Sequence, residues 1–203
     1  KNKGQWTKES PSSSPSARMY SAMGSLRVAD GKIVLFGGLD NNNNNLVDTW
    51  IYDQQKKDWT HDNAGAAIFS PKRRRSHAMA SLGDASVLSF GGVGADGFDI
   101  AGASTWIFNQ RTSDWMEVKT TASSSPSHRA QLAMALLEES RNVILFGGRD
   151  FDNPFKDTWV FDQRKNEWKE IYPSTSSPSA RRSHAMASIG SNNVVLFGGH
   201  DGN

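Results

Sequence analysis

Short hydrophobic stretches with the period of β-strands run along the whole chain, separated by polar turns. Residues 76–82 alternate, which places His77, Met79 and Ser81 on one face of a strand and apolar side chains on the other. Residues 143–146 are apolar at every position, as in a strand that is buried on both faces. The periodicity therefore predicts strands rather than helices.

Two more strand patterns complete the unit. Residues 158–162 are β-branched and aromatic, and residues 167–171 carry charges on one face, which keeps an edge strand from pairing with other chains. The polar link at residues 162–166 and the turn at Asp30 and Gly31 are typical of β-hairpins. The sequence thus predicts a four-stranded antiparallel meander.

The unit repeats along the chain. Pairs of glycines close four apolar runs at intervals of 54, 56 and 51 residues, and three of these pairs are followed by two tryptophans nine residues apart. A fixed period of about 50 residues indicates a repeat architecture, in which each period forms one structural unit. The repeated positions are Gly37, Gly38, Trp50 and Trp59; Gly91, Gly92, Trp106 and Trp115; Gly147, Gly148, Trp159 and Trp168; and Gly198 and Gly199.

A meander of this length cannot bury both of its faces by itself, so copies pack face to face around an axis as a β-propeller. The apolar run with two glycines, followed by Asp-Thr-Trp at residues 48–50 or 157–159 and by a second tryptophan, resembles the kelch repeat. The resemblance covers essentially the whole chain. It implies an all-β, kelch-type propeller in which the glycine pair ends the second strand and aromatic side chains pack between neighbouring blades.

The glycine pairs have a physical reason of their own. Residues without Cβ allow positive φ and the close approach of a group from another strand. We expect an aromatic side chain to be that group.

The repeat phasing predicts three complete blades, at about residues 15–64, 71–120 and 126–173. Partial blades are expected at residues 178–203 and 1–9, with Trp6 in a fourth strand. The two ends do not supply one whole blade between them, because nine residues stand where complete blades use 19 or more. We therefore interpret the chain as a segment of a longer one with further repeats; completion by another copy of the chain is the alternative.

Composition narrows the possible functions. The 23 Lys and Arg nearly balance the 21 Asp and Glu, so the charge does not indicate nucleic acid or anionic lipid as a partner. No apolar run approaches the roughly 20 residues that cross a bilayer, so no membrane is expected. The sequence has no cysteine, which excludes disulfides, thiolate metal sites and a thiol nucleophile. Together with the absence of an N-glycosylation acceptor, this favours a cytoplasmic setting.

One face of the predicted propeller is the best candidate for binding. Strand direction alternates, so the long connections at residues 39–47, 93–103 and 149–156 emerge on the face where each blade begins. Loops that vary on a rigid scaffold commonly carry binding sites. The candidate partner-binding residues on this face are Arg18, Arg74, Arg75, Arg129, Arg181, Arg182, Asp150 and His200.

Two interpretations of the arginines remain open. Kelch proteins that capture acidic peptides resemble this arrangement, so the arginines are expected to hold an acidic segment or a carboxylate of another protein in bidentate fashion. The alternative is that each arginine pairs with a local carboxylate or carbonyl as part of the repeat. His77 and His184 are interpreted as packing positions rather than metal ligands, because Ser21 and Leu132 occupy the same slot in other copies.

Enzymatic kelch propellers form the competing class. The copper-radical oxidase type requires a cysteine, and the plant specifier type resembles a Glu-x3-Asp-x3-His iron triad that does not occur in this sequence. A sugar-acid mutarotase remains an alternative, because such sites use dispersed residues. The copies are alike, however, and catalysis needs one asymmetric site. We favour a non-enzymatic interaction scaffold or adaptor without a cofactor or metal, or else a structural subunit of a larger assembly.

Overall fold

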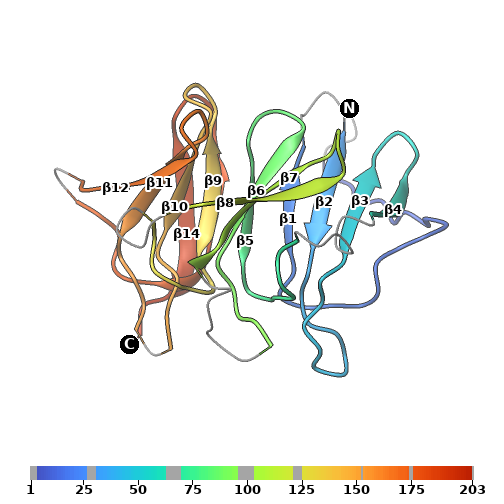
Figure 1. Cartoon of the computed structure of the whole chain (residues 1–203), viewed down its shortest axis with the longest axis horizontal. Helices are drawn as coiled ribbons and strands as arrows, with labels where there is room; N and C mark the ends of the chain where they lie inside the picture. Colours follow the sequence, from blue (N-terminus) through green and yellow to red (C-terminus); the bar gives the residue numbers. More distant parts are fainter. Residues whose placement is uncertain are drawn as a thin grey trace.

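The computed structural model describes residues 4–26, 31–62, 70–95, 103–120, 125–151, 153–173 and 176–202. Within these residues every regular element is a β-strand. The strands form three antiparallel sheets of four strands and one sheet of two, each with its strands in chain order. Figure 1 shows the first sheet (blue to cyan) on the right, the second (green) in the middle and the third (yellow to orange) on the left, where the last sheet (red) overlaps it in this view. The predicted all-β propeller of four-stranded antiparallel blades is confirmed.

Each sheet is one blade or part of one. The first contains β1 (Ala22–Ser25), β2 (Lys32–Phe36), β3 (Thr49–Asp53) and β4 (Asp58–Asp62). The second contains β5 (Ala78–Ser81), β6 (Ser86–Phe90), β7 (Thr105–Asn109) and β8 (Asp114–Val118). The third contains β9 (Ala133–Leu137), β10 (Asn142–Phe146), β11 (Thr158–Asp162) and β12 (Glu167–Ile171). The last contains β13 (Arg182–Ser188) and β14 (Val194–His200).

The first strands of the sheets lie side by side, β1 next to β5, β5 next to β9 and β9 next to β13. The strands predicted at 158–162 and 167–171 are observed with those bounds. β5 is shorter than the alternation predicted, because Ser76 has φ 56° and its N–H bonds across to the carbonyl of Tyr20 in the preceding sheet (2.8 Å). Because the Ser76 N–H bonds to another blade, β5 begins only at Ala78.

The core lies between neighbouring sheets and depends on the second tryptophans. Trp115, in β8, packs with its ring centroid 4.9 Å from that of Phe36 in the first sheet, and its Nε1 donates to Thr49 Oγ1 (3.0 Å). Trp168, in β12, repeats the arrangement on the second sheet, with Phe90 at 5.3 Å and Thr105 Oγ1 at 2.9 Å. Each fourth strand thus anchors its blade to the preceding one, as the family resemblance implied.

The glycine pairs bring the backbones of two blades together. Gly37 and Gly38 have φ 61° and 107°, and the Gly38 N–H donates to the carbonyl of Arg74 in the next blade (2.9 Å). A Cβ on Gly37 would lie 2.6 Å from that carbonyl oxygen. The expected aromatic neighbour is present as the His77 ring, 3.2 Å from that Cβ position, but the closest group is the backbone carbonyl. The same contact joins Gly91 to Arg129 and Gly147 to Arg181.

The glycine pair ends β2, β6 and β10, as predicted, but lies within β14. In the first three sheets the pairing beyond the glycines is an isolated bridge, for example Arg75 with Val93. In the last sheet the equivalent pair, Arg182 with His200, belongs to the β13–β14 ladder, which skips Ser183 and Gly199. The difference is therefore one of strand length and not of pairing.

The strand predicted around Trp6 does not form. Residues 4–18 contain no strand, and the Trp6 side chain is 99% exposed. The segment instead follows the first sheet, where Ser13 N donates to Asp58 Oδ1 (3.0 Å) and Lys57 pairs with Glu9 (3.2 Å). Trp6 has no third strand beside it in the described part of the chain, so it lacks the pairing that holds Trp115 and Trp168 in their strands.

Candidate functional site

The four arginines that precede the first strands share one pattern of hydrogen bonds. In each, Nε donates to the carbonyl two residues earlier, and Nη1 donates to the carbonyl of the first glycine of the same blade. The Nη1 distances are 3.0 Å from Arg18 to Gly37, 3.0 Å from Arg74 to Gly91, 3.1 Å from Arg129 to Gly147 and 2.8 Å from Arg181 to Gly198. These arginines tie the entrance of each blade to the end of its second strand.

Two of the arginines also hold a carboxylate. Arg18 binds both oxygens of Asp48 (2.7 and 2.8 Å), and Arg129 binds both oxygens of Asp157 (2.5 and 2.8 Å). Burial would raise the pKa of each aspartate, but the arginine and a tryptophan indole N–H outweigh it, so the pKa of both carboxyls lies below the usual range. In the second blade Ser104 takes this place and accepts from Arg74 Nη2 (3.0 Å).

Arg18, Arg74 and Arg129 thus form the local contacts of the second interpretation, in which each arginine pairs with a carboxylate or carbonyl of its own repeat. Arg74 and Arg129 are each 1% exposed, and the Arg18 side chain is 5% exposed. Their donors point to the backbone and to side chains of their own blades. Phe155 covers the Arg129 guanidinium at 4.1 Å from its ring centroid. These three groups are part of the blade and are not accessible to a partner.

The next residue along the chain is placed differently. Arg75 Nη1 donates to the amide oxygen of Asn45 (2.8 Å), and Arg182 Nη1 lies 3.5 Å from the amide oxygen of Gln131. Arg149 Nε donates to that same Gln131 oxygen (2.9 Å). Two guanidinium groups thus converge on one neutral acceptor. Within the described residues, neither Arg75 nor Arg182 forms an ion pair with a carboxylate.

Four residues, one before or at the start of the first strand of each sheet, form what we call the axial mouth: Tyr20, Ser76, Gln131 and Ser183. Each member has φ between 56° and 58°. Ser76 N–H donates to Tyr20 O, Gln131 N–H to Ser76 O and Ser183 N–H to Gln131 O, each at 2.8 Å. This ladder joins the four blades. Beneath it is a hollow of about 280 Å³ that also touches His77 and His184.

The remaining predicted site residues lie near the mouth or in its loops. His200 pairs with Arg182 across β13 and β14, which brings the two together as predicted for one face. Asp150 accepts the N–H of Asn153 (3.0 Å) and so stabilises the turn after β10. Sequence reasoning overlooked Gln131 and Arg149. Aligning the copies would have identified Gln131, because the same position holds Tyr20, Ser76 and Ser183 in the other blades.

His77 and His184 are packing residues, as predicted. Each ring meets a phenylalanine edge-on at 5.6 Å, Phe36 for His77 and Phe146 for His184. Burial and the charge of Arg74 lower the pKa of His77 to about 3, and burial lowers the pKa of His184. Both imidazoles are therefore neutral at physiological pH.

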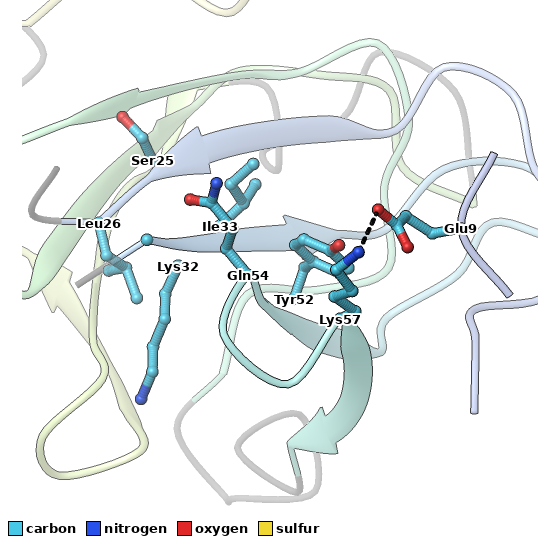
Figure 2. A pocket seen from close by; sticks show the side chains of 9 residues that line it. Glu9, Ser25, Leu26, Lys32, Ile33, Tyr52, Gln54 and Lys57 are labelled. Carbon is cyan, nitrogen blue, oxygen red and sulfur yellow. Dashed lines mark ion pairs between the residues drawn. The ribbon is translucent and has the colours of Figure 1, made fainter. Parts of the chain in front are cut away.

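A larger hollow, of about 640 Å³, lies on the first sheet away from the axial mouth. Figure 2 shows side chains that line it, Lys32 and Tyr52 among them, with the Lys57–Glu9 ion pair at one side. Its charged groups stand on long side chains and do not point to one common place.

In the part of the chain that the structure describes, no helix is long and apolar enough to span a bilayer.

Comparison with known proteins decides the family. The family model described as the KLHDC2/KLHL20/DRC7 Kelch-repeats domain matches residues 1–199. The chain belongs to the kelch-repeat family. Domains of this kelch family are generally protein-interaction domains.

Individual relatives are distant. The kelch chain is 27% identical to Adagio-like protein 1 of Oryza sativa subsp. japonica over 83% of its length and 26% of the relative's. It is 25% identical to Kelch domain-containing protein 1 of Mus musculus over 77% of its length and 37% of the relative's. It is 29% identical to the N-(sulfonatooxy)prop-2-enimidothioate sulfolyase of Thlaspi arvense over 64% of its length and 36% of the relative's. The kelch chain thus spans well under half of these relatives.

Proposed function

We propose that this kelch domain is a non-enzymatic interaction module, and that its axial mouth binds an acidic segment or a carboxylate of a partner protein. The observation that supports this is the setting of Arg75 and Arg182. Arg75 Nη1 donates to the amide oxygen of Asn45, and Arg182 Nη1 lies 3.5 Å from that of Gln131 in the mouth, whereas Arg18 and Arg129 are paired with aspartates. Arg149, whose Nε donates to the Gln131 oxygen next to Arg182, adds a further guanidinium group at this place.

The arrangement suits an anion for physical reasons. A neutral acceptor orients a guanidinium without cancelling its charge, so the side chain loses less conformational freedom when it binds an anion. The N–H groups that remain can meet both oxygens of a carboxylate, and such charge-assisted pairs are the stronger hydrogen bonds. The hollow beneath the mouth, lined by Ser76 and Ser183, gives a partner segment room to enter.

An array of short acidic peptides, each with a free and an amidated C-terminus, provides the probe. For the tightest peptide, Arg182→Gln and Arg75→Gln should each weaken binding by about tenfold or more, without a change in thermal midpoint. Arg111→Gln, in an exposed turn, is the matched control and should change neither. Arg129→Gln should instead destabilise the fold by about 3 kcal/mol, because it leaves Asp157 buried without its partner.

Equal binding by Arg182→Gln, Arg75→Gln and the unmodified chain would contradict the site. Binding that is insensitive to salt would also contradict it, because exposed charge pairs are screened at physiological ionic strength. The lack of cysteine supports a cytoplasmic setting for the interaction.

The relative named as a sulfolyase favours one enzymatic alternative. Against it, His77 and His184 pack on phenylalanine rings, so the two imidazoles nearest the mouth are poor general acids or bases. Turnover of sulfonated thiohydroximate substrates by the chain, lost in a mouth variant, would replace our proposal with an enzymatic one.

A further inference from the structure

The connection between β10 and β11 carries an exposed aromatic side chain, Phe151. This side chain is 58% exposed, and its ring meets the His128 ring edge-on with the centroids 6.1 Å apart. Single exposed apolar residues are common on protein surfaces and by themselves indicate nothing. The way in which Phe151 is held, and the charges that lie next to it, distinguish it from such residues.

Phe151 lies in a turn that is fixed by hydrogen bonds. Arg149 and Pro154 form a bridge that closes the turn. Inside it the Asp150 N–H donates to the carbonyl of Asn153 (3.3 Å), and the Asn153 N–H donates to the Asp150 carboxylate (3.0 Å). The backbone around Phe151 is thus held in place before a ligand arrives, which lowers the conformational entropy that binding costs.

The first blade shows that this kind of turn does not need an aromatic residue. There the Asp40 N–H donates to the carbonyl of Asn44 (3.1 Å), and the Asn44 N–H donates to the Asp40 carboxylate (2.8 Å). The residue after this aspartate is Asn41, which is polar and exposed. The ring of Phe151 is therefore not required by the turn, and aromatic rings on rigid loops are typical anchors of protein interfaces.

Arg149 connects this aromatic residue to the axial mouth. Its Nη1 donates to the carbonyl of Phe151 (2.9 Å), and its Nε donates to the amide oxygen of Gln131 (2.9 Å). Arg182 Nη1 lies 3.5 Å from the same amide oxygen. Joined through one guanidinium, these contacts keep the Phe151 carbonyl within roughly 12 Å of the Arg182 guanidinium, a span that about three residues of an extended chain cover.

We propose that the axial mouth selects an acidic segment in which an apolar residue lies two or three positions from the carboxylate. The carboxylate meets Arg182 beside Arg149, and the apolar side chain packs on the ring of Phe151. This inference rests on the function proposed above and names the chemistry of its partner. Charge alone attracts many anions, whereas an apolar contact at a fixed spacing separates one acidic segment from another.

A set of Gly-Ser peptides tests the spacing. Each peptide carries two adjacent glutamates and one leucine, and the leucine occupies every other position in turn; a matching peptide has no leucine. Affinity, measured by calorimetry, should be about tenfold higher when the leucine lies two or three positions from a glutamate, because burial of this side chain then adds to the ion pair. This gain should persist at raised salt, which screens only the charged contact.

Variants of the chain assign the gain to one side chain. Phe151→Asn copies the residue of the first blade, so it should leave the thermal midpoint unchanged and reduce every leucine peptide to the affinity of the leucine-free one. Phe151→Leu keeps an apolar surface and should retain most of the gain. Met116→Asn, at a side chain that is 52% exposed in β8, is the matched control and should change nothing.

The outcomes separate this inference from the function on which it rests. Equal affinity at every leucine position, or an undiminished gain in Phe151→Asn, would overturn the inference while Arg182→Gln still weakens the leucine-free peptide. If Arg182→Gln had no effect on that peptide, or if no peptide bound, the function of the axial mouth would be contradicted instead, and the inference with it.

Discussion

Neighbouring arginines in this chain have opposite roles. Arg74 is buried and bonds to the glycine carbonyl of its own blade, while Arg75 donates to the amide oxygen of Asn45 in the preceding blade. The same contrast separates Arg181, at the edge of β14, from Arg182. Alternate positions of an extended chain point to opposite sides, so one residue determines whether a guanidinium stabilises the blade or remains available to a ligand.

His77 provides a test at the scale of one residue. Its pKa of about 3 in the folded chain lies below the 6.5 of an exposed imidazole, so the unfolded chain binds more protons between these values. Stability should therefore fall as pH decreases from about 6.5 toward 3, with a slope contribution of up to about 1.4 kcal/mol per pH unit.

Replacing His77 with leucine, the residue that Leu132 supplies at the same position in the third blade, should remove this contribution. Urea unfolding of both proteins at several pH values measures it. Thr60→Val, at an exposed residue in β4 that does not titrate, serves as the control and should keep the original slope. If His77→Leu were to keep it as well, another group would be responsible for the dependence.

At the scale of elements, the contact between blades is made by backbone as much as by side chains. The first glycine of each pair accommodates the carbonyl of the next blade's arginine, and the second donates a hydrogen bond to it. The last sheet lacks such a neighbour among the described residues, because a Cβ on Gly198 would meet nothing within 4 Å. Gly198 can therefore serve as a control for the equivalent glycines that do contact a neighbouring blade.

Gly147→Ala and Gly198→Ala should lower the free energy of unfolding by different amounts, and the difference measures the close approach between two blades. Both residues have positive φ, 61° and 73°, so both substitutions incur about 1–2 kcal/mol of backbone strain. Only Gly147→Ala also places a Cβ 2.6 Å from Arg181 O, which should add about 1–3 kcal/mol. Chemical denaturation of the two variants measures the difference, and equal losses would show that the blades do not depend on this approach.

Over the whole molecule, the first three sheets are joined by one tryptophan at each of their two interfaces, and all four sheets are joined by the ladder of the axial mouth. Trp115 connects the second sheet to the first, and Trp168 connects the third to the second. Because each blade contacts its neighbours in the row, stability is close to a sum of blade and interface contributions.

Trp115→Phe should lower the free energy of unfolding by about 3 kcal/mol, since it leaves a cavity and removes the donor to the buried Thr49 hydroxyl. Trp6→Phe, at a side chain that is 99% exposed, should change it by less than about 0.5 kcal/mol. Urea titration followed by circular dichroism measures both. A similar loss in the two variants would mean that the interface tryptophan does not bear on stability.

The sequence by itself determined the repeat, the four-stranded meander and the strand bounds of β11 and β12, because these follow from local periodicity and from residues that recur in phase. It also indicated the face that carries the arginines. It did not identify which arginines are buried, because their partners are distant in sequence: Asp48 and Asp157 lie 30 and 28 residues from Arg18 and Arg129, and Ser104 lies 30 residues from Arg74. Only the tertiary structure decided this, and with it the convergence of Arg149 and Arg182 on Gln131 and the failure of Trp6 to find a strand. Pairing across such separations is set by packing, which local pattern does not encode.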